Sequence, residues 1–280
     1  MDIKALLREY GLHPHKGLGQ NFLVDSRVLG RIVDTAELEP HDVVLEIGSG
    51  LGTLTQALAE VARRVVAVEL DEQLVDVLRT RLANFRNVEI ICGDVLDLDV
   101  PRLVSGKLEP LTPFKVVANI PYYITSAVLR HVLEAAARPK LMVVMVQREV
   151  AQRIVAHPGQ MSLLAVSVQF YGRPRLVFRV PARAFYPAPK VDSAVVRIDP
   201  HPQLPLDGRE VGAFFDVVRA GFAQRRKQLR NALLHGLPLS ADQLSEGMAA
   251  AAIDPSRRAQ TLSVEEWLAL YHALGAVAGE

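Results

Sequence analysis

The sequence predicts an α/β fold, in which helices cover both faces of a mostly parallel β-sheet and a small α-helical domain follows. First, short apolar runs alternate with segments of helical periodicity over roughly the first 150 residues. Second, these runs are almost continuously apolar, which is typical of strands buried on both faces of a sheet. Third, a stretch rich in Pro and Gly at 199–208 is followed by a region that shows helical patterns only.

Five apolar runs are expected to form the parallel strands: VVLEIG (43–48), VVAVEL (65–70), VEIICG (88–93), FKVVAN (114–119) and LMVVMVQ (141–147). The segments TLTQALAEVA, EQLVDVLRTRLANF and SAVLRHVLEAAA lie between them and have helical spacing. RLVFRV and SAVVRI are expected to add an antiparallel edge. MSLLAVSVQF fits a helix or a strand equally well.

These elements divide the chain into a domain over residues 1–200, a linker over 201–208 and a helical domain over 209–280. A chain of 280 residues, half of them hydrophobic, is long enough for a large core and a smaller second domain. No apolar run reaches the roughly 18 residues of a membrane span, and the first residues lack the pattern of a signal peptide. We therefore expect a cytoplasmic protein without a membrane partner.

Cysteine and histidine usage argues against a disulfide and a metal centre. The single cysteine, Cys92, leaves no internal partner, and its apolar surroundings predict a buried, unreactive thiol. The eight histidines show no paired ligand spacing, so no metal site is expected.

The charges are unevenly distributed although the net charge is only +1. Residues 171–235 contain 12 Lys and Arg against 5 Asp and Glu, and the rest of the chain has a net charge of −6. This asymmetry indicates a basic face for a polyanion, although ordinary surface variation gives similar splits.

A glycine loop joins the first predicted strand to a helix in VVLEIGSGLGTLTQAL. Gly48, Gly50 and Gly52 leave room for a ligand to contact backbone, or else form an ordinary tight turn. The dinucleotide fingerprint requires a third small residue where Thr53 stands, and the Walker A lysine is absent. The loop therefore predicts a ligand other than a dinucleotide or a nucleoside triphosphate.

Two carboxylates follow the next two predicted strands. Glu69 ends its strand about twenty residues after the glycine loop, where an acid can accept both ribose hydroxyls of an adenosine. Asp94 could accept the exocyclic amine of adenine, although Asp after Gly is also common in plain turns. Because parallel strands end at one edge of a sheet, these groups predict an adenosyl ligand without a pyrophosphate, most simply S-adenosylmethionine.

The tetrad Asn119-Ile120-Pro121-Tyr122 follows a further strand at this same edge. The side-chain oxygen of Asn119 and a backbone carbonyl, that of Ile120, could hold the N–H groups of an adenine amine and expose its nitrogen lone pair. Pro121 would aim that carbonyl, and Tyr122 would stack on the base. The alternative is a capped strand end with core tyrosines, and Tyr123 is expected to be such a packing residue.

The ordered set of motifs resembles the ribosomal RNA adenine dimethyltransferase family over nearly the whole chain. The motifs are KGLGQNFLVD (16–25), EIGSGLGTLT (46–55), VELD (68–71), GDVL (93–96), NIPYYIT (119–125), FYPAPKVDSAVVRI (185–198), FAQRRKQLRNAL (222–233) and RRAQTLSVEEW (257–267). The resemblance is greatest to the small-subunit branch.

The resemblance implies a Rossmann-like methyltransferase that dimethylates N6 of two adjacent adenosines near the 3′ end of 16S rRNA, in the small (30S) ribosomal subunit or its precursor. Residues 1–25 would cover the cofactor S-adenosylmethionine, and Phe185 would face the target base opposite Tyr122, although core packing was equally plausible for this side chain. The implied cofactor contacts are Gln20, Asn21, Leu23, Gly48, Gly50, Gly52, Glu69, Leu70, Asp94, Val95 and Asn119.

Recognition of so large an RNA requires a surface outside the pocket, and FAQRRKQLRNAL is the best candidate. As one helix, it would place Phe222, Leu229 and Leu233 on an apolar stripe. Arg225 and Arg230 would flank the stripe on opposite sides, and Lys227 would lie farther round. Arg226 would fall near the stripe and would have to snorkel or find a partner. These cations would meet phosphates, unless this is simply a solvated basic helix.

Three other functions remain open at this point. One is the macrolide-resistance type of methyltransferase, which acts on large-subunit rRNA. Another is a non-catalytic ribosome-assembly factor on the same fold, although intact Asn119 and Glu69 argue against it. A DNA adenine methyltransferase would share the tetrad, but the helical domain is short for a base-reading domain. We expect the protein to act as a monomer.

Overall fold

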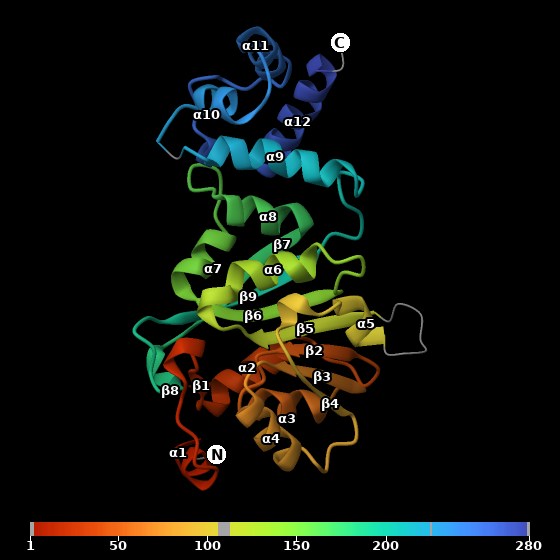
Figure 1. Ribbon diagram of the computed structural model, residues 1–280, viewed down its shortest axis with the longest axis vertical. Helices are drawn as coiled ribbons and strands as arrows, with labels where there is room; N and C mark the ends of the chain where they lie inside the picture. Colours follow the sequence, from red (N-terminus) through yellow and green to blue (C-terminus); the bar gives the residue numbers. More distant parts are fainter. Residues whose placement is uncertain (1–2, 106–112, 225, 279–280) are drawn as a thin grey trace. The chain divides into compact units, whose positions relative to one another are not determined.

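The computed structural model describes residues 3–105, 113–224 and 226–278, which divide into two compact units (Figure 1). The first unit comprises Met1–Gln152 and Gly172–Pro200, and the second comprises Arg153–Tyr171 and His201–Glu280. Within the described residues, no helix has both the length and the apolar character needed to cross a membrane.

The first unit contains a seven-stranded sheet with the order β4-β3-β2-β5-β6-β9-β7. Five neighbouring strands run parallel: β4, β3, β2, β5 and β6. Strand β9 pairs antiparallel with both β6 and β7. The predicted parallel sheet with an antiparallel edge is therefore confirmed. The strands are β2 (Val43–Ile47), β3 (Arg64–Glu69), β4 (Val88–Cys92), β5 (Phe114–Asn119), β6 (Leu141–Gln147), β7 (Gly172–Val180) and β9 (Ser193–Pro200).

Helices connect the parallel strands, as the alternating pattern predicts. Buried side chains of α2 and α3 form one core cluster with Val44, Val117 and Val143 from three neighbouring strands. Asp25 begins α2 by accepting the backbone N–H groups of Arg27 and Val28. The helices are α1 (Ile3–Glu9), α2 (Ser26–Thr35), α3 (Thr53–Ala59), α4 (Glu72–Arg81), α5 (Val100–Ser105), α6 (Thr125–Leu133) and α7 (Arg148–Ile154), with short 3₁₀ turns η1 (Lys16–Leu18), η2 (Val95–Asp97), η3 (Tyr122–Ile124) and η4 (Ala182–Ala184).

A two-stranded sheet includes the end of the N-terminal segment 1–25, which by the family resemblance would cover the cofactor. Strand β1 (Phe22–Leu23) pairs antiparallel with β8 (Phe185–Tyr186). Helix α1 adds to this region, because Ile3 and Leu7 form a cluster with Phe22 and with Leu51 of the glycine loop. The N-terminal segment is thus packed on the loop that follows β2.

The environment of Cys92 corrects one prediction. The thiol is exposed, not buried. Strand β4 is one of the two edge strands of the sheet, and none of its five residues is fully buried. A run of apolar residues does not reveal whether a strand is central or at an edge, so the sequence could not distinguish the two environments.

The second unit is helical. Its elements are α8 (Leu163–Tyr171), α9 (Glu210–Phe222), α10 (Leu229–Gly236), α11 (Ala241–Ala250), η5 (Ala259–Thr261) and α12 (Val264–Ala278). Trp267 is fully buried, and a Cβ placed on Gly221 would lie 2.3 Å from its ring, so α9 and α12 approach too closely for any larger side chain there. The ambiguous segment MSLLAVSVQF is the helix α8.

The expected domain boundaries need one correction. Residues 153–171 belong to the helical unit and not to the sheet domain, although residues 201–208 form no helix or strand, as a linker should. The physical reason is aromatic packing, because the ring of Phe170 stacks on Phe214 at 4.9 Å and meets Phe215 edge-on at 5.3 Å. Such a contact between distant segments leaves no local signal in the sequence.

Candidate active site

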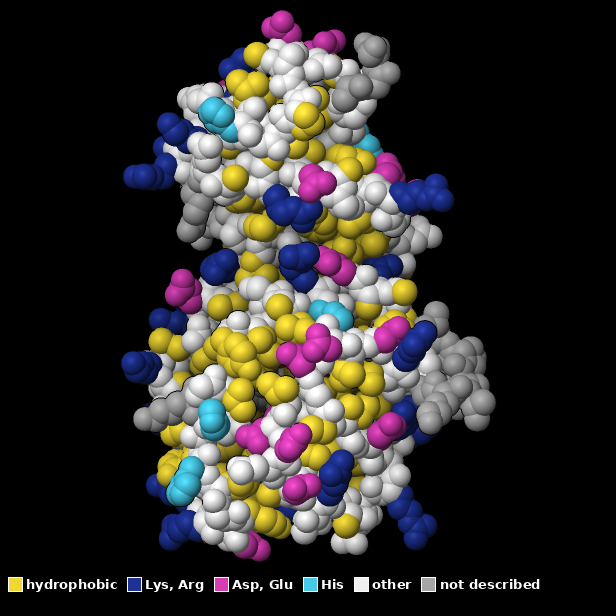
Figure 2. Space-filling model, in the orientation of Figure 1, with side chains coloured by type: hydrophobic (Ala, Val, Ile, Leu, Met, Phe, Trp, Pro, Cys, Tyr) yellow, Lys and Arg dark blue, Asp and Glu magenta, His cyan; other side chains and the backbone are white. Residues whose placement is uncertain are grey.

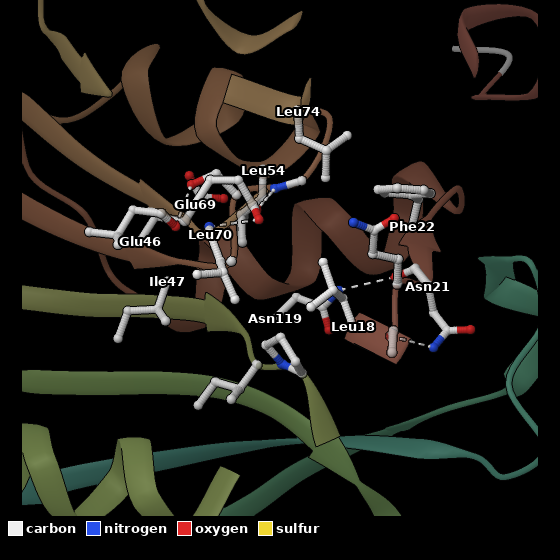
Figure 3. Close-up of a pocket in the computed structure, with 18 of the residues that line it drawn as sticks. Leu18, Asn21, Phe22, Glu46, Ile47, Leu54, Glu69, Leu70, Leu74 and Asn119 are labelled. Atoms are coloured by element: carbon white, nitrogen blue, oxygen red, sulfur yellow. Dashed lines mark hydrogen bonds between the residues drawn. The ribbon is translucent and has the colours of Figure 1, made fainter. Parts of the chain in front are cut away.

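A cavity lies at the carboxyl ends of the parallel strands of the first unit (Figure 3). Its walls come from the segments that follow β2, β3, β4 and β5, and from the N-terminal segment between Leu18 and Leu23. The predicted residues Gln20, Asn21, Leu23, Gly48, Gly50, Glu69, Leu70, Asp94, Val95, Asn119, Ile120, Pro121 and Tyr122 all line it. The topology therefore brings these residues together, as expected for an open α/β sheet.

The glycine loop requires glycine for two reasons. Gly48, Gly50 and Gly52 all have positive φ values, of 74°, 57° and 76°. A Cβ would also lie 3.3 Å from Pro121 at Gly48, 3.3 Å from the Phe22 ring at Gly50 and 2.7 Å from Leu78 at Gly52. The loop is thus held between the Asn119 turn, the N-terminal segment and α4. Gly52 is not among the lining residues, and its role is to let α3 begin against α4.

Glu69 is the most strongly fixed carboxylate of the cavity. Its Oε1 accepts the backbone N–H groups of Leu70 and Asp71 at 2.9 and 3.1 Å, and its Oε2 accepts that of Gly50 at 2.8 Å. The side chain is 8% exposed, and burial raises its pKa although the three backbone hydrogen bonds favour the ionised form. Each carboxylate oxygen can accept about two hydrogen bonds, so Oε2 retains capacity for a ligand hydroxyl.

Asp94 forms the ordinary turn that the sequence left open, and it also faces the cavity. Its Oδ1 accepts the Leu96 N–H at 2.9 Å and caps the turn η2, as in an ordinary Asx turn. The residue also lines the cavity, beside the buried Val95. Leu70 is 43% exposed at the cavity wall, where an apolar ligand surface would cover it.

The N-terminal segment is tied to the cavity by side-chain amides. The Gln20 Nε2 group donates to Asp71 Oδ2 at 2.7 Å, and its Oε1 accepts the His15 N–H at 2.7 Å. The Asn21 side chain donates to the Gly19 carbonyl at 2.8 Å. Gln20 and Asn21 therefore have structural partners as well as a place in the cavity wall.

Asn119 ends strand β5, and its amide group is oriented by the N-terminal segment. The Asn119 Nδ2 group donates to the Asn21 carbonyl at 3.5 Å, which leaves Oδ1 as the acceptor that the side chain can offer to a ligand (Figure 3). The Ile120 N–H donates to the Met145 carbonyl at 3.2 Å, and Pro121 has a φ of −54°. These contacts fix the turn that carries the tetrad.

Tyr122 is held from its hydroxyl end. The Tyr122 Oη and Ser193 Oγ atoms are 2.7 Å apart, and Ser193 on β9 is fully buried. Burial raises the pKa of Tyr122, so the phenol stays neutral at physiological pH. The ring therefore has a fixed position at the cavity wall.

Phe185 does not lie where the family resemblance placed it. Its side chain is 4% exposed and packs in the core cluster with Leu23, Val143 and Val180, and it does not line the cavity. The prediction that it faces the target base is therefore wrong for this structure. An aromatic residue between prolines was equally compatible with core packing, which is what the structure has.

The predicted basic helix is interrupted. Helix α9 ends at Phe222 and α10 begins at Leu229, and the described residues between them, 223, 224 and 226–228, are not helical. The break has a tertiary cause, because the Leu229 N–H donates to the Arg257 carbonyl at 2.7 Å. Phe222 and Leu229 are seven residues apart and would share a face of one helix, so periodicity could not reveal the break.

Of the candidate RNA contacts, Arg226 and Lys227 consequently lie between the two helices, and Arg230 lies on α10. Arg226 and Lys227 are exposed and Arg230 is half-buried, so Arg226 does not need to snorkel as the continuous helix would require. Arg225 lies outside the described residues. On the face seen in Figure 2, Lys and Arg side chains are scattered among acidic and hydrophobic ones, without a single basic patch over the described residues.

Glu46 is the residue of the cavity that sequence reasoning missed. It lies on β2, is 1% exposed, and its Oε2 has no hydrogen-bond partner in the part of the chain that the structure describes. Burial raises its pKa to about 8, against the opposing effect of the Thr55 and Ser49 hydroxyls, and the charge of Glu69 raises it further. A glutamate inside the otherwise apolar run VVLEI was the available signal.

This buried acid gives a testable pH dependence of stability. The folded protein keeps the Glu46 proton up to a pKa of about 8, whereas an unfolded chain releases it near the ordinary value of 4.5. The folded state therefore binds the extra proton between these values, and the free energy of unfolding falls as pH rises through that window. We expect Glu46→Gln to remove this pH-dependent fall in the free energy of unfolding, which is on the order of 1 kcal/mol per pH unit.

The measurement is urea unfolding of both proteins at pH 5, 6, 7 and 8. The difference in unfolding free energy between variant and wild type should increase with pH, while the exposed acid substitution Glu60→Gln should leave the wild-type profile unchanged. Parallel profiles for Glu46→Gln and wild type would show that Glu46 is ionised throughout.

The described residues contain no group of three or more His, Cys, Asp or Glu side chains that could hold a metal ion. The cavity instead combines acceptors, glycine backbone and aromatic and aliphatic walls. Such a site can bind a nucleoside-containing ligand and position a second reactant beside it.

Comparisons with known proteins give the site a family context. Residues 11–275 match the family model described as ribosomal RNA adenine dimethylase. A ribosomal RNA small subunit methyltransferase A of Dehalococcoides mccartyi is 48% identical over 264 residues, which cover 94% of this chain and 89% of that protein. One from Alkaliphilus metalliredigens is 42% identical over 270 residues, covering 95% and 94%.

Two solved structures are also similar to this chain. The 23S rRNA methyltransferase ErmE has a TM-score of 0.71 and 31% identity, covering 91% of this chain and all of that one. A dimethyladenosine transferase from Plasmodium falciparum has a TM-score of 0.77 at 23% identity, covering 92% and 98%, and shows the same fold.

Proposed function

The chain belongs to the ribosomal RNA adenine dimethylase family, and we propose that it dimethylates N6 of two adjacent adenosines near the 3′ end of 16S rRNA in the small ribosomal subunit. It is an S-adenosylmethionine-dependent methyltransferase. One observation carries the assignment of the site: four successive strand ends bring the glycine loop, Glu69, Asp94 and Asn119 to the wall of a single cavity.

The residues of this cavity fit the cofactor. The Glu69 carboxylate would accept the ribose hydroxyls, because three backbone amides already hold it at the cavity wall. The free oxygen of Asp94 would accept the adenine amine, between Val95 and Leu70. Gln20, Asn21 and Leu23 would close the cavity from the N-terminal side. When bound, S-adenosylmethionine supplies an activated methyl group on a positively charged sulfur.

The tetrad would position the target adenine. Asn119 Oδ1 and the Ile120 carbonyl would accept the two N–H groups of the amine and favour a pyramidal nitrogen whose lone pair points to the methyl group. The amine held in this way would accept the methyl group that the cofactor supplies, and the methylated amine would lose its extra proton to water. Tyr122, fixed by Ser193, would support the base by stacking. Most of the acceleration would come from positioning.

The small subunit is favoured as the substrate over the large subunit. Relatives whose name specifies the small subunit are 48% and 42% identical over nearly the whole chain, compared with 31% for the 23S enzyme ErmE. An intact set of Asn119, Glu69 and glycine loop argues for catalysis and against a purely structural assembly factor. We further propose that the protein works in the cytoplasm, as a monomer, on the small subunit or its precursor, and contributes to its maturation.

The test uses purified protein with radiolabelled S-adenosylmethionine and three substrates: unmethylated small subunits, large subunits and duplex DNA. We expect label to enter only the small-subunit RNA. Label in large subunits or in DNA would assign the enzyme to another methyltransferase class, and no transfer to any substrate would favour the assembly factor.

Recognition of the small subunit by the segment between α9 and α10 gives a further prediction. Arg226 and Lys227 are both exposed there, so we expect Arg226→Ala plus Lys227→Ala to weaken binding to small subunits. Each lost phosphate contact should lower the magnitude of the log–log salt slope by roughly 0.7–0.9. Binding is measured by titration of small subunits at several salt concentrations.

The matched control is Arg79→Ala plus Arg86→Ala, which removes two exposed cations near the amino end of β4, away from the cavity. It should keep the wild-type slope. A wild-type slope in the Arg226 and Lys227 variant would show that this segment does not contact the RNA backbone.

A further inference from the structure

Tyr123 stands out among the aromatic side chains. The chain has nine Phe, six Tyr and one Trp, all within the described residues, and Tyr123 is the only one of them in the exposed class, at 57%. It also lines the cavity. The sequence had suggested a packing residue, and this interpretation is wrong, because Tyr123 is exposed.

The local backbone explains why two neighbouring tyrosines diverge. Tyr122 and Tyr123 are consecutive residues of the 3₁₀ turn η3, where successive side chains are about 120° apart around the axis. Tyr122 is directed inward by its contact with Ser193. Tyr123 must then project from a different side of the turn, towards the mouth of the cavity.

The ring of Tyr123 lies close to the N-terminal segment. A Cβ placed on Gly19 would lie 3.7 and 3.9 Å from the Cδ1 and Cε1 atoms of the ring, so the N-terminal segment passes close to it at a residue without a side chain. The remaining ring surface is accessible. A supported, accessible aromatic ring is the kind of surface on which proteins stack unpaired bases.

We propose that Tyr123 is a stacking platform for the unpaired base next to the adenosine in the cavity; this rests on the proposed function. A base that leaves its stack to enter an active site deprives its neighbour of a stacking partner. With two adjacent target adenosines, that neighbour is a purine, which offers a large surface for stacking. Tyr123 would thereby help to hold the pair of nucleotides while each base is methylated.

The experiment compares steady-state methylation of unmethylated small subunits by wild type, Tyr123→Phe, Tyr123→Leu and Tyr123→Ala. Stacking contributes roughly 1–3 kcal/mol per base, which corresponds to roughly 5- to 150-fold in KM for the subunit. We expect this increase in KM for Tyr123→Ala and Tyr123→Leu. Tyr123→Phe keeps the ring, so its KM should be near that of wild type. Val61→Ala changes another exposed hydrophobic residue, which lies just before β3 and does not line the cavity, and it should have no effect.

Calorimetric binding of S-adenosylmethionine separates stacking from a role in supporting the N-terminal segment. The affinity should be unchanged in all three Tyr123 variants. A loss of cofactor affinity that matches the loss of activity would overturn the proposal and assign Tyr123 to the segment around Gly19. A KM within twofold of wild type for Tyr123→Ala would overturn it as well.

A second arm tests the identity of the stacked base. In small subunits whose neighbouring adenosine is replaced by uridine, Tyr123→Ala should have a smaller effect, because the two changes remove the same interaction and are not additive. Equal effects on both RNAs would contradict the proposal. If wild type did not methylate small subunits at all, the proposed function itself would fail, which is a different outcome.

Discussion

Replacing Asn119 with alanine is expected to slow methyl transfer by roughly 100- to 1000-fold, the usual effect of removing one preorganised polar contact from an active site. The variant loses the Oδ1 acceptor for the target amine, while the glycine loop and the Glu69 contacts stay in place. The affinity for S-adenosylmethionine should therefore change by no more than a few-fold. Single-turnover kinetics with small subunits and calorimetry with the cofactor measure the two quantities.

Asn84→Ala is the matched control, because this asparagine is exposed and lies on the turn before β4. It should have wild-type kinetics. If Asn119→Ala lost cofactor affinity and rate in equal proportion, Asn119 would serve the cofactor pocket through its contact with the Asn21 carbonyl, and not the target amine.

Replacing Glu69 with alanine is expected to weaken binding of S-adenosylmethionine by roughly 5- to 150-fold. This corresponds to a loss of about 1–3 kcal/mol for leaving buried hydroxyl partners unsatisfied. The change also releases the N–H groups of Gly50, Leu70 and Asp71, so the glycine loop should become less well ordered. Calorimetry measures the affinity, and thermal unfolding without cofactor measures the cost to the fold.

The control for this prediction is Glu72→Ala, which removes an exposed acid three residues away at the start of α4. Its cofactor affinity should equal that of wild type. Wild-type affinity in a folded Glu69→Ala protein would rule out the assignment of Glu69 to the ribose.

The sequence predicted the sheet well because its strands are buried on both faces. VVLEI and LMVVMVQ are almost continuously apolar, and the loops between them end in recognisable groups such as the three glycines and the Asn119 tetrad. Residues at the ends of parallel strands must converge, so the location of the cavity followed from the alternation of elements alone. The three glycines also allow close packing against neighbouring side chains, and their spacing in the sequence could not reveal these contacts.

The predictions that failed concern contacts between distant segments. Phe185 pairs with Leu23 and is buried in the core, while Leu229 begins a new helix because its N–H bonds to Arg257. Cys92 is exposed because β4 is an edge strand. None of these partners is adjacent in sequence, so neither periodicity nor local motifs could identify them.

The proton on Glu46 and the exposure of Tyr123 also follow from tertiary surroundings. Burial raises the pKa of Glu46 to about 8, and this burial depends on the helices and the N-terminal segment that enclose the cavity. Tyr123 is exposed beside a neighbour, Tyr122, whose hydroxyl is held by Ser193 on β9. In both cases the residue type was visible in the sequence, but its environment was not.

The central claim is that this cavity presents N6 of two adjacent small-subunit adenosines to S-adenosylmethionine. Mass spectrometry of RNA fragments tests it most directly, after unmethylated small subunits are incubated with the cofactor and either wild type or Asn119→Ala. We predict N6,N6-dimethyladenosine at two adjacent positions near the 3′ end of 16S rRNA with wild type, and almost none with the variant in the same time. Methylation at another position, or equal dimethylation by the Asn119→Ala protein, would contradict the claim.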